Sequence, residues 1–215
     1  MIKKIILLLG LPGSGKGTQG AILSKELALP HISTGDIFRK MILEESKEAK
    51  LLAGYMNEGK LVPSDLVNKI VRQFILSDEC HEGCILDGYP RTLAQAEYFI
   101  ENIDTKVSVI YLKIDDDVVV KRILGRISCA SCGKLYNEYF DKPKKDGVCD
   151  ECGATQFVAR ADDDEDTLLA RIEEYKKETL PLIEYYKHKG KFFTVNAGES
   201  KEQVVNELAS IIKKI

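Results

Sequence analysis

A glycine-rich loop placed directly after an apolar run constrains this chain more than any other feature. Residues 10–19 read GLPGSGKGTQ and follow the apolar residues 5–9. Glycines can adopt positive φ and let the backbone approach a polyphosphate, so that successive N–H groups face its anionic oxygens. Lys16 adds a mobile positive charge, and a helix beginning at about Lys16 adds the positive end of its dipole. The stretch predicts a strand, a phosphate-binding loop and a helix, and therefore a nucleotide site.

The loop departs from the general phosphate-loop pattern at one position. That pattern places Ser or Thr directly after the lysine, whereas here Gly17 intervenes and the hydroxyl arrives as Thr18. We therefore do not expect Thr18 to ligate Mg²⁺ directly. The alternative, a glycine turn that binds nothing, is disfavoured by the apolar run before the turn and by the lysine at the start of the helix.

The overall composition narrows the class of protein. The chain has 215 residues, of which 44% are hydrophobic and 30% charged, as expected for one α/β domain with insertions. Its net charge of −3 argues against a nucleic-acid or membrane surface, so an anion site must be built from locally clustered arginines. The apolar run at 5–9 is too short for a signal peptide, and no apolar segment approaches the roughly 20 residues that cross a bilayer. We expect a cytoplasmic protein.

Four of the six cysteines form two Cys-x-x-Cys pairs, and each pair is followed by a glycine. This spacing is typical of a structural zinc site, because two tight turns can present four thiolates to one tetrahedral ion. The alternatives are two disulfides, which a reducing compartment disfavours, and a redox-active pair, which the matched second pair disfavours. Iron in place of zinc stays open. The predicted ligands are Cys129, Cys132, Cys149 and Cys152. We interpret Cys80 and Cys84 as buried or incidental thiols.

Alternating apolar segments predict the order of the elements. Runs typical of strands alternate with helical stretches, as in a parallel sheet that helices cover on both faces. The predicted strands are residues 3–9, 84–86, 107–114 and 192–195, with a short one at 31–32. Two stripes at helical spacing are interpreted as core packing: Leu66, Val67, Ile70, Val71, Phe74 and Ile75, then Val204, Val205, Leu208, Ile211 and Ile212.

Two segments interrupt this alternation. Residues 33–62 look helical, and residues 127–161 carry the cysteine pairs and strand-like pieces at 135–140 and 156–158. The second segment is too short to bury much apolar surface, so we expect a metal cross-link to stabilise it. The acidic run at 162–166 is interpreted as a solvated helix start.

Further polar residues complete the candidate site. Asp87 follows the apolar residues 85–86, at the carboxyl end of a predicted parallel strand, where ligands of open α/β sheets bind. It is either a water-mediated Mg²⁺ ligand or a turn residue before a glycine, and the phosphate loop upstream favours the first. Arg122 and Arg126 are four residues apart and can project from one face. The candidate cations for phosphate are Arg39, Arg91, Arg122, Arg126, Arg160 and Arg171.

Taken together, these residues show that the chain closely resembles adenylate kinases of the long, zinc-bearing bacterial type over its whole length. Besides the loop and the four cysteines, the matching motifs are Ser33-Thr34-Gly35-Asp36 with Arg39, Gly59-Lys60-Leu61-Val62, Asp87-Gly88-Tyr89-Pro90-Arg91-Thr92 with Gln95, Arg122-Ile123-x-Gly125-Arg126, Arg160-x-Asp162-Asp163 and Arg171. The resemblance implies an α/β fold with a three-layer, P-loop NTPase-like parallel core at 1–32, 63–126 and 165–215. It also implies two inserted flaps, a helical nucleoside-monophosphate-binding domain at 33–62 and a zinc-bearing β lid at 127–164.

The same resemblance assigns roles to single residues. The implied ATP site comprises Gly13, Ser14, Gly15, Lys16, Gly17, Thr18, Arg122, Arg126, Leu135, Tyr136 and Glu199. The implied AMP site comprises Thr34, Arg39, Lys60, Leu61, Val62, Gly88, Tyr89, Pro90, Arg91, Gln95, Arg160 and Arg171. The implied catalytic residues are Lys16, Arg91, Arg126, Arg160, Arg171 and Asp87. The related pyrimidine kinases carry alanine at the position of Thr34 and a short lid without zinc, so both features favour AMP.

The implied reaction is reversible phosphoryl transfer, ATP + AMP = 2 ADP, in adenine nucleotide homeostasis and salvage. The implied cofactors are Mg²⁺ with ATP and structural Zn²⁺. We expect a monomer whose partners are ATP, AMP and ADP, with no nucleic acid and no membrane. Closure of the lid would bring Arg126 and Arg160 onto the phosphates, and Asp162-Asp163 would tether those arginines in one of two states.

Three alternatives to this function stay open at the level of the sequence. One is a kinase for another nucleoside monophosphate, and one is a nucleotide-binding switch that transfers no phosphoryl group. The third is a nucleic-acid-binding zinc module, against which the acidic run and the net charge argue. The three histidines form no triad or metal cluster in the sequence and are assigned no catalytic role.

Overall fold

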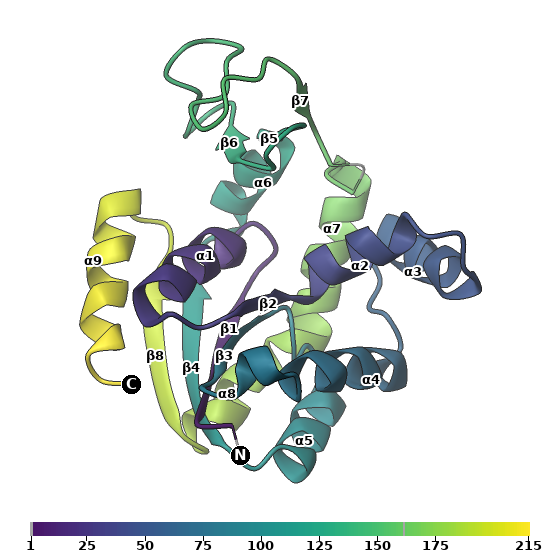
Figure 1. The fold of residues 1–215 in the computed structure, drawn as a ribbon, viewed down its shortest axis with the longest axis vertical. Helices are drawn as coiled ribbons and strands as arrows, with labels where there is room; N and C mark the ends of the chain where they lie inside the picture. Colours follow the sequence, from purple (N-terminus) through teal and green to yellow (C-terminus); the bar gives the residue numbers. More distant parts are fainter. Residues whose placement is uncertain (1, 161) are drawn as a thin grey trace.

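A computed structural model of the chain describes residues 2–160 and 162–215. Its centre is a five-stranded sheet with the order β2-β3-β1-β4-β8 (Figure 1). The strands are β1 (Lys4–Gly10), β2 (His31–Ser33), β3 (Cys84–Asp87), β4 (Lys106–Lys113) and β8 (Lys191–Asn196). All four neighbouring pairs are parallel. The predicted parallel sheet is therefore confirmed, including its short strand at 31–32.

The two faces of the sheet carry two separate apolar clusters. Side chains alternate along β1, so that Ile5, Leu7 and Leu9 enter one cluster while Ile6 and Leu8 enter the other. The first cluster contains residues of α4 (Ser64–Ile75), α5 (Leu93–Asn102) and α8 (Pro181–Lys187). The second contains residues of α1 (Lys16–Leu27), α6 (Asp116–Leu124), α7 (Glu165–Glu174) and α9 (Lys201–Ile212). Helices thus cover both faces, as the alternation of segments predicts.

Most members of the two predicted helical stripes are core residues. Val67, Ile70 and Ile75 of α4 are buried, and the stripe of α9 is buried at Val204, Leu208 and Ile211. Phe74 is different, because its side chain is 43% exposed and lies on the outer side of α4. Helical spacing therefore places Phe74 in the predicted stripe, but the structure does not bury it.

Two groups of elements extend away from the sheet (Figure 1). The helices α2 (Thr34–Ile42) and α3 (Lys47–Asn57) lie on one side, as predicted for residues 33–62. At the top of the view is a small antiparallel sheet of β5 (Arg126–Cys129), β6 (Leu135–Asn137) and β7 (Phe157–Val158), in the order β6-β5-β7. We call residues 126–158 the cysteine segment. Short turns complete the element order, η1 (Asp78–Cys80) before β3 and the π-helical turn η2 (Tyr175–Thr179) between α7 and α8.

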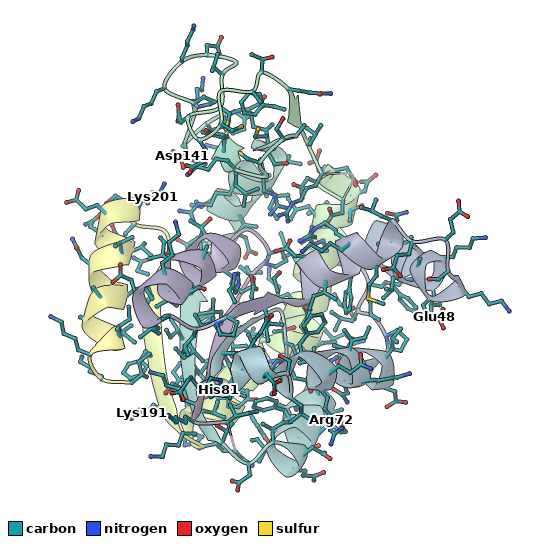
Figure 2. The ribbon with its side chains drawn as sticks, viewed as in Figure 1. Glu48, Arg72, His81, Asp141, Lys191 and Lys201 are labelled. Atoms are coloured by element: carbon teal, nitrogen blue, oxygen red, sulfur yellow. The ribbon has the colours of Figure 1, made fainter. Side chains whose placement is uncertain are left out.

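The cysteine segment has little apolar core of its own. Its cluster consists of Cys129, Tyr136 and Cys149, with Ile127, Ala154 and Phe157 packed against it. The strand predicted at 135–140 ends at Asn137, because the Asn137 side-chain oxygen accepts the backbone N–H groups of Tyr139 and Phe140 in the turn that follows. The segment also contacts helix α9, where Lys201 Nζ donates to Asp141 Oδ2 at 3.2 Å (Figure 2).

The acidic run before α7 is only partly solvated. Asp164 caps α7 by accepting the N–H of Thr167 at 2.9 Å, and Glu165 and Asp166 occupy the first helical turn, as predicted. Asp162 and Asp163 are different, since Asp162 is 8% exposed and the Asp163 side chain only 2%. The local sequence does not distinguish the buried Asp162 and Asp163 from the acidic residues that follow, because arginines on other elements bury these two side chains. Among the described residues, no helix combines the length and the apolar character needed to span a bilayer.

Candidate functional site

The loop between β1 and α1 has the backbone that the sequence predicts. Gly13 and Gly15 have φ values of 77° and 93°, and α1 begins at Lys16 with Gly15 as its N-cap. A Cβ on Gly13 would come within 2.8 Å of Ile123 on α6, so glycine is also needed for close packing there. Because the N-cap carries no side chain, the first N–H groups of α1 are left for a ligand.

Lys16 is folded back over this loop. Its Nζ donates to the carbonyl oxygens of Gly10 and Leu11, both at 2.8 Å. Burial lowers the pKa of Lys16 to about 8; Asp87 opposes this effect, and neighbouring arginines add to it. The charged amine of Lys16 is held mainly by the dipoles of these carbonyl groups, so a negatively charged phosphate oxygen would stabilise it further.

The positively charged side chains of the predicted site line one large cavity. It has a volume of about 660 Å³ and reaches from the phosphate loop to the cysteine segment. The arginines come from α2, from the loop after β3, from α6, from β5, from the residues after β7 and from α7. All six predicted arginines line it, namely Arg39, Arg91, Arg122, Arg126, Arg160 and Arg171.

The arginines lie close enough to lower one another's proton affinity. Burial, and after it the nearby charge of Arg171, lower the pKa of Arg91 to about 10. Burial also lowers the pKa of Arg160 to about 10, with added repulsion from Arg126 and Arg39. Positive charges that repel one another within one cavity give it a strong affinity for anions.

Carboxylates pair with most of these arginines. Arg126 Nε donates to Asp163 Oδ2 at 2.7 Å, and its Nη2 donates to the other carboxylate oxygen. Arg171 Nη1 donates to Asp162 Oδ2 at 3.1 Å. Arg160 lies 3.9 Å from Asp36 of α2. The predicted tether of Arg126 is therefore present. Arg160 faces Asp36 of α2 in this arrangement, and Arg171 pairs with Asp162, so the tether predicted for Arg160 in one of two states stays a prediction.

Asp87 is not a free turn residue. It is the last residue of β3, its side chain is 9% exposed, and Oδ2 lies 3.8 Å from a Cβ built on Gly17 at the start of α1. His31 Nε2 approaches the Asp87 carboxylate at 3.6 Å and has no hydrogen-bond partner within the described residues. His31 is not predicted to have a role, since a lone histidine at the start of a strand belongs to no motif.

A smaller cavity of about 60 Å³ adjoins the large one on the side of α2. Of the predicted AMP residues, it is lined by Thr34, Arg39, Lys60, Leu61, Val62, Gly88, Arg91, Gln95 and Arg171. Pro90 and Arg160 line the large cavity. Tyr89 lines neither cavity in the described part of the chain; it is 2% exposed and packs in the core, with its ring edge on Phe99. The sequence does not predict that Tyr89 is buried, because residues 88–90 form a turn and show no periodic pattern of apolar residues.

The amide of Gln95 is held in one orientation. Its Oε1 accepts the backbone N–H of Arg91 at 2.8 Å, and its Nε2 donates to Ser64 Oγ at 3.2 Å. Behind it, the Tyr89 hydroxyl donates to Asn68 Oδ1 at 2.7 Å. Ser64 and Asn68 escape sequence reasoning, because they lie at ordinary helical positions and meet Gln95 and Tyr89 only through packing.

The predicted ATP residues all line the large cavity. They are the loop residues Gly13, Ser14, Gly15, Lys16, Gly17 and Thr18, with Arg122, Arg126, Leu135, Tyr136 and Glu199. The contributions come from α1, α6, β6 and the loop before α9, which the sheet and the cysteine segment bring together.

The four cysteines fit a metal ion. Their sulfur atoms all lie within 4.8 Å of one another. The Cys129–Cys152 and Cys132–Cys149 sulfur pairs are each 3.6 Å apart, far from the roughly 2.05 Å of a disulfide. Thiolates at about 2.3 Å from a tetrahedral ion lie roughly 3.8 Å apart, close to these distances. The cluster is compatible with zinc.

Comparisons with known proteins agree with this geometry. A family model described as adenylate kinase matches residues 8–191. The chain is 48% identical over 209 residues to a protein named adenylate kinase from Rickettsia africae (strain ESF-5), covering 97% of this chain and 99% of the relative. It is 47% identical over 209 residues to the adenylate kinase of Rickettsia conorii (strain ATCC VR-613 / Malish 7), with the same coverage. It is 46% identical to that of Rickettsia bellii (strain RML369-C), again over 209 residues and with the same coverage.

Proposed function

Because the chain belongs to the adenylate kinase family, it is a nucleoside monophosphate kinase, and we propose that its large cavity joins the phosphates of ATP and AMP. The reaction is reversible phosphoryl transfer, ATP + AMP = 2 ADP. One observation supports this use of the cavity above all others: Lys16 and six arginines from separate elements line one space between the phosphate loop and the Gln95 pocket.

The chemistry explains why so many cations are needed. Two mutually repelling anions must meet in line, and the transition state spreads negative charge over the equatorial oxygens of the transferred group. We propose Lys16, Arg91, Arg126, Arg160 and Arg171 as the groups that compensate this charge, with arginine forks binding phosphate oxygens in pairs. The AMP phosphate is itself the nucleophile, so the proposal requires no side-chain nucleophile.

Kinases of this family use their nucleotide with Mg²⁺, and the ion supplies charge neutralisation at the phosphates. Asp87 is the proposed residue that would hold the ion through water. Its position supports this role, because it is a buried carboxylate at the end of β3 beside the start of α1. Thr18, which is exposed, is not proposed as a direct ligand.

We propose that residues 33–62 and 127–164 move as two flaps against a core at 1–32, 63–126 and 165–215. Closure would bring Arg126 and Arg160 onto the phosphates and exclude water, which would otherwise receive the phosphoryl group. Asp163 pairs with Arg126, and Asp36 lies near Arg160, so both carboxylates oppose this movement of the arginines. Phosphate oxygens would therefore compete with Asp163 for Arg126 and with Asp36 for Arg160.

The metal ion, the cellular location and the oligomeric state are also proposed. Zinc is the proposed ion of the four-cysteine site, in a structural role, because four thiolates leave no open position. A cytoplasmic location fits the six free cysteines, since thiols persist in a reducing compartment. A monomer suffices, because one chain supplies the cations and both pockets.

The function is tested by a nucleotide panel with purified protein, Mg²⁺ and ATP. AMP, GMP, CMP and UMP are offered separately, and ADP is measured by a coupled assay. We expect two equivalents of ADP for each AMP consumed and much lower kcat/KM with the other three. ATP binding without AMP-dependent ADP formation would instead indicate a nucleotide-binding switch.

The lowered pKa of Lys16 predicts a pH dependence of ATP binding. Lys16 is charged in the free protein below pH 8 and increasingly neutral above it, whereas bound phosphate requires the charged form. Binding at pH 8 should therefore take up about half a proton, and the Kd for ATP should rise toward tenfold per pH unit above pH 8. Calorimetry in two buffers of different ionisation enthalpy measures the uptake. An uptake near zero, with a Kd flat to pH 9.5, contradicts the assignment of Lys16 to the phosphates.

A further inference from the structure

Tyr136 lies between the four cysteines and the nucleotide cavity. It is the middle residue of β6, it is 4% exposed, and it packs in the small cluster with Cys129 and Cys149. Its ring meets that of Phe157 edge to face, with centroids 5.6 Å apart. The same residue lines the large cavity. One side chain therefore contacts both sites.

The hydroxyl of Tyr136 has a defined role as donor and acceptor. The backbone N–H of Asp150 donates to the phenol oxygen at 2.7 Å. An amide N–H can only donate, so the phenol proton is left for another partner. That partner is the sulfur of Cys149 at 3.5 Å. The phenol thus links β6 to the second cysteine pair by two hydrogen bonds.

The two cysteine pairs are otherwise closely matched. Cys129 and Cys149 each accept a turn-closing N–H from the following glycine, Gly133 or Gly153, at 2.9 Å on the backbone carbonyl. Each of their sulfur atoms also faces two backbone N–H groups of its own turn. Among the described residues, the phenol is an additional donor on Cys149 that has no equivalent on Cys129.

An extra donor matters because of charge. Four thiolates around a divalent cation carry a net charge of −2, and hydrogen bonds to the sulfur atoms stabilise that charge where water is excluded. Removing such an outer partner typically costs 10- to 100-fold in metal affinity. The hydroxyl of Tyr136 is therefore expected to strengthen metal retention.

The strand pairing extends this link to the cavity. Tyr136 pairs with Ile127 in the register of β5 and β6, and the next pair is Asn137 with Arg126. Arg126 is one of the arginines of the large cavity. A metal that orders β6 through Tyr136 therefore also orders the strand that carries a phosphate-binding arginine.

We propose that Tyr136 is a positioning residue whose hydroxyl couples the four-cysteine metal centre to nucleotide binding, so that each ligand strengthens retention of the other. The inference rests on the proposed zinc-bearing lid and the proposed ATP pocket. Coupling between two binding sites is reciprocal, so the factor by which ATP raises metal affinity must equal the factor by which metal raises ATP affinity. Loss of the hydroxyl should reduce both factors together.

The test uses the full-length, zinc-loaded protein and the substitution Tyr136→Phe, which keeps the ring and removes only the hydroxyl. The matched control is Tyr139→Phe, because Tyr139 is nearby and 63% exposed. Zinc transfer to a chromogenic chelator gives the metal affinity, with and without Mg²⁺-saturated ATP. We expect a 10- to 100-fold loss of affinity in Tyr136→Phe, and ATP protection of the metal in wild type and control only.

A spectroscopic readout separates this role from general loosening of the fold. With Co²⁺ in place of zinc, the sulfur-to-metal charge-transfer band should shift in Tyr136→Phe and stay unchanged in Tyr139→Phe. Metal affinity within twofold of wild type, or undiminished ATP protection in Tyr136→Phe, would overturn the inference. A wild-type protein that forms ADP but takes up no metal would contradict the zinc lid itself and this inference with it.

Discussion

Replacing Lys16 by methionine is expected to lower turnover by about two to three orders of magnitude. Methionine keeps the length of the side chain but removes the charge that we place on the phosphates. Loss of one preorganised donor at a developing negative charge typically costs 10²- to 10³-fold in kcat, or about 2.7–4 kcal/mol. Steady-state kinetics with saturating Mg²⁺, ATP and AMP measure the effect.

Stability should not account for that loss. Burial lowers the pKa of Lys16, which means that the folded protein disfavours the charged lysine. This penalty is complete below pH 8, the folded pKa, and fades only as the pH rises toward the unfolded value of 10.5. At pH 7, Lys16→Met should therefore melt no lower than wild type.

The matched control for this variant is Lys25→Met, on the same helix with an exposed side chain. It should keep wild-type turnover. Near-normal turnover in Lys16→Met, with the ATP pocket saturated, would rule out the role assigned to this lysine. An equal loss in Lys25→Met would point to a general effect of substitutions in α1.

Removing one cysteine of the four-cysteine cluster is expected to have the second large effect, on metal binding and on the melting temperature. In Cys132→Ser the metal should bind poorly, and the melting temperature should fall by about 6–12 °C, as a loss of roughly 3 kcal/mol implies for a chain of this length. The physical reason is the size of the local core, which consists of three buried residues and three partly buried ones. Calorimetry and metal analysis of the same sample measure both quantities.

The neighbouring substitution Ser131→Ala serves as the control, since it lies in the same turn and removes no proposed ligand. Hydrogen exchange should show lost protection across residues 126–158 in Cys132→Ser and retained protection in β1 and β4. At a temperature well below the melting temperature of Cys132→Ser, its turnover should stay close to that of wild type. A metal-free protein of unchanged melting temperature contradicts a structural role for the ion.

The sequence predicts the elements that depend on local pattern. The loop at 10–19 and the start of α1 follow from glycines, a lysine and an apolar run in immediate succession. The parallel strands follow from apolar runs flanked by helical segments, and the cysteine cluster follows from two matched spacings. Each of these features is encoded within a few residues, so no distant contact is needed to read it.

Local pattern is less reliable where a neighbour on another element decides the outcome. Phe74 has the helical spacing of a core residue, but its side chain is 43% exposed. Asp163 looks like part of a solvated acidic run, but it is buried against Arg126. Arg160 is two residues from Asp162 in the sequence, but it lies near Asp36 of another helix in the structure.

The sequence by itself determined the fold class, the phosphate loop and the four candidate metal ligands, because each rests on residue types at short, regular spacing. Only the tertiary structure decided that six arginines from six different places line one cavity, and which carboxylates pair with Arg126, Arg160 and Arg171. It alone placed the Tyr136 hydroxyl against Cys149 and the Gln95 amide against Ser64. These contacts join residues far apart in the chain, where packing and the need to satisfy buried polar groups, not spacing, choose the partner.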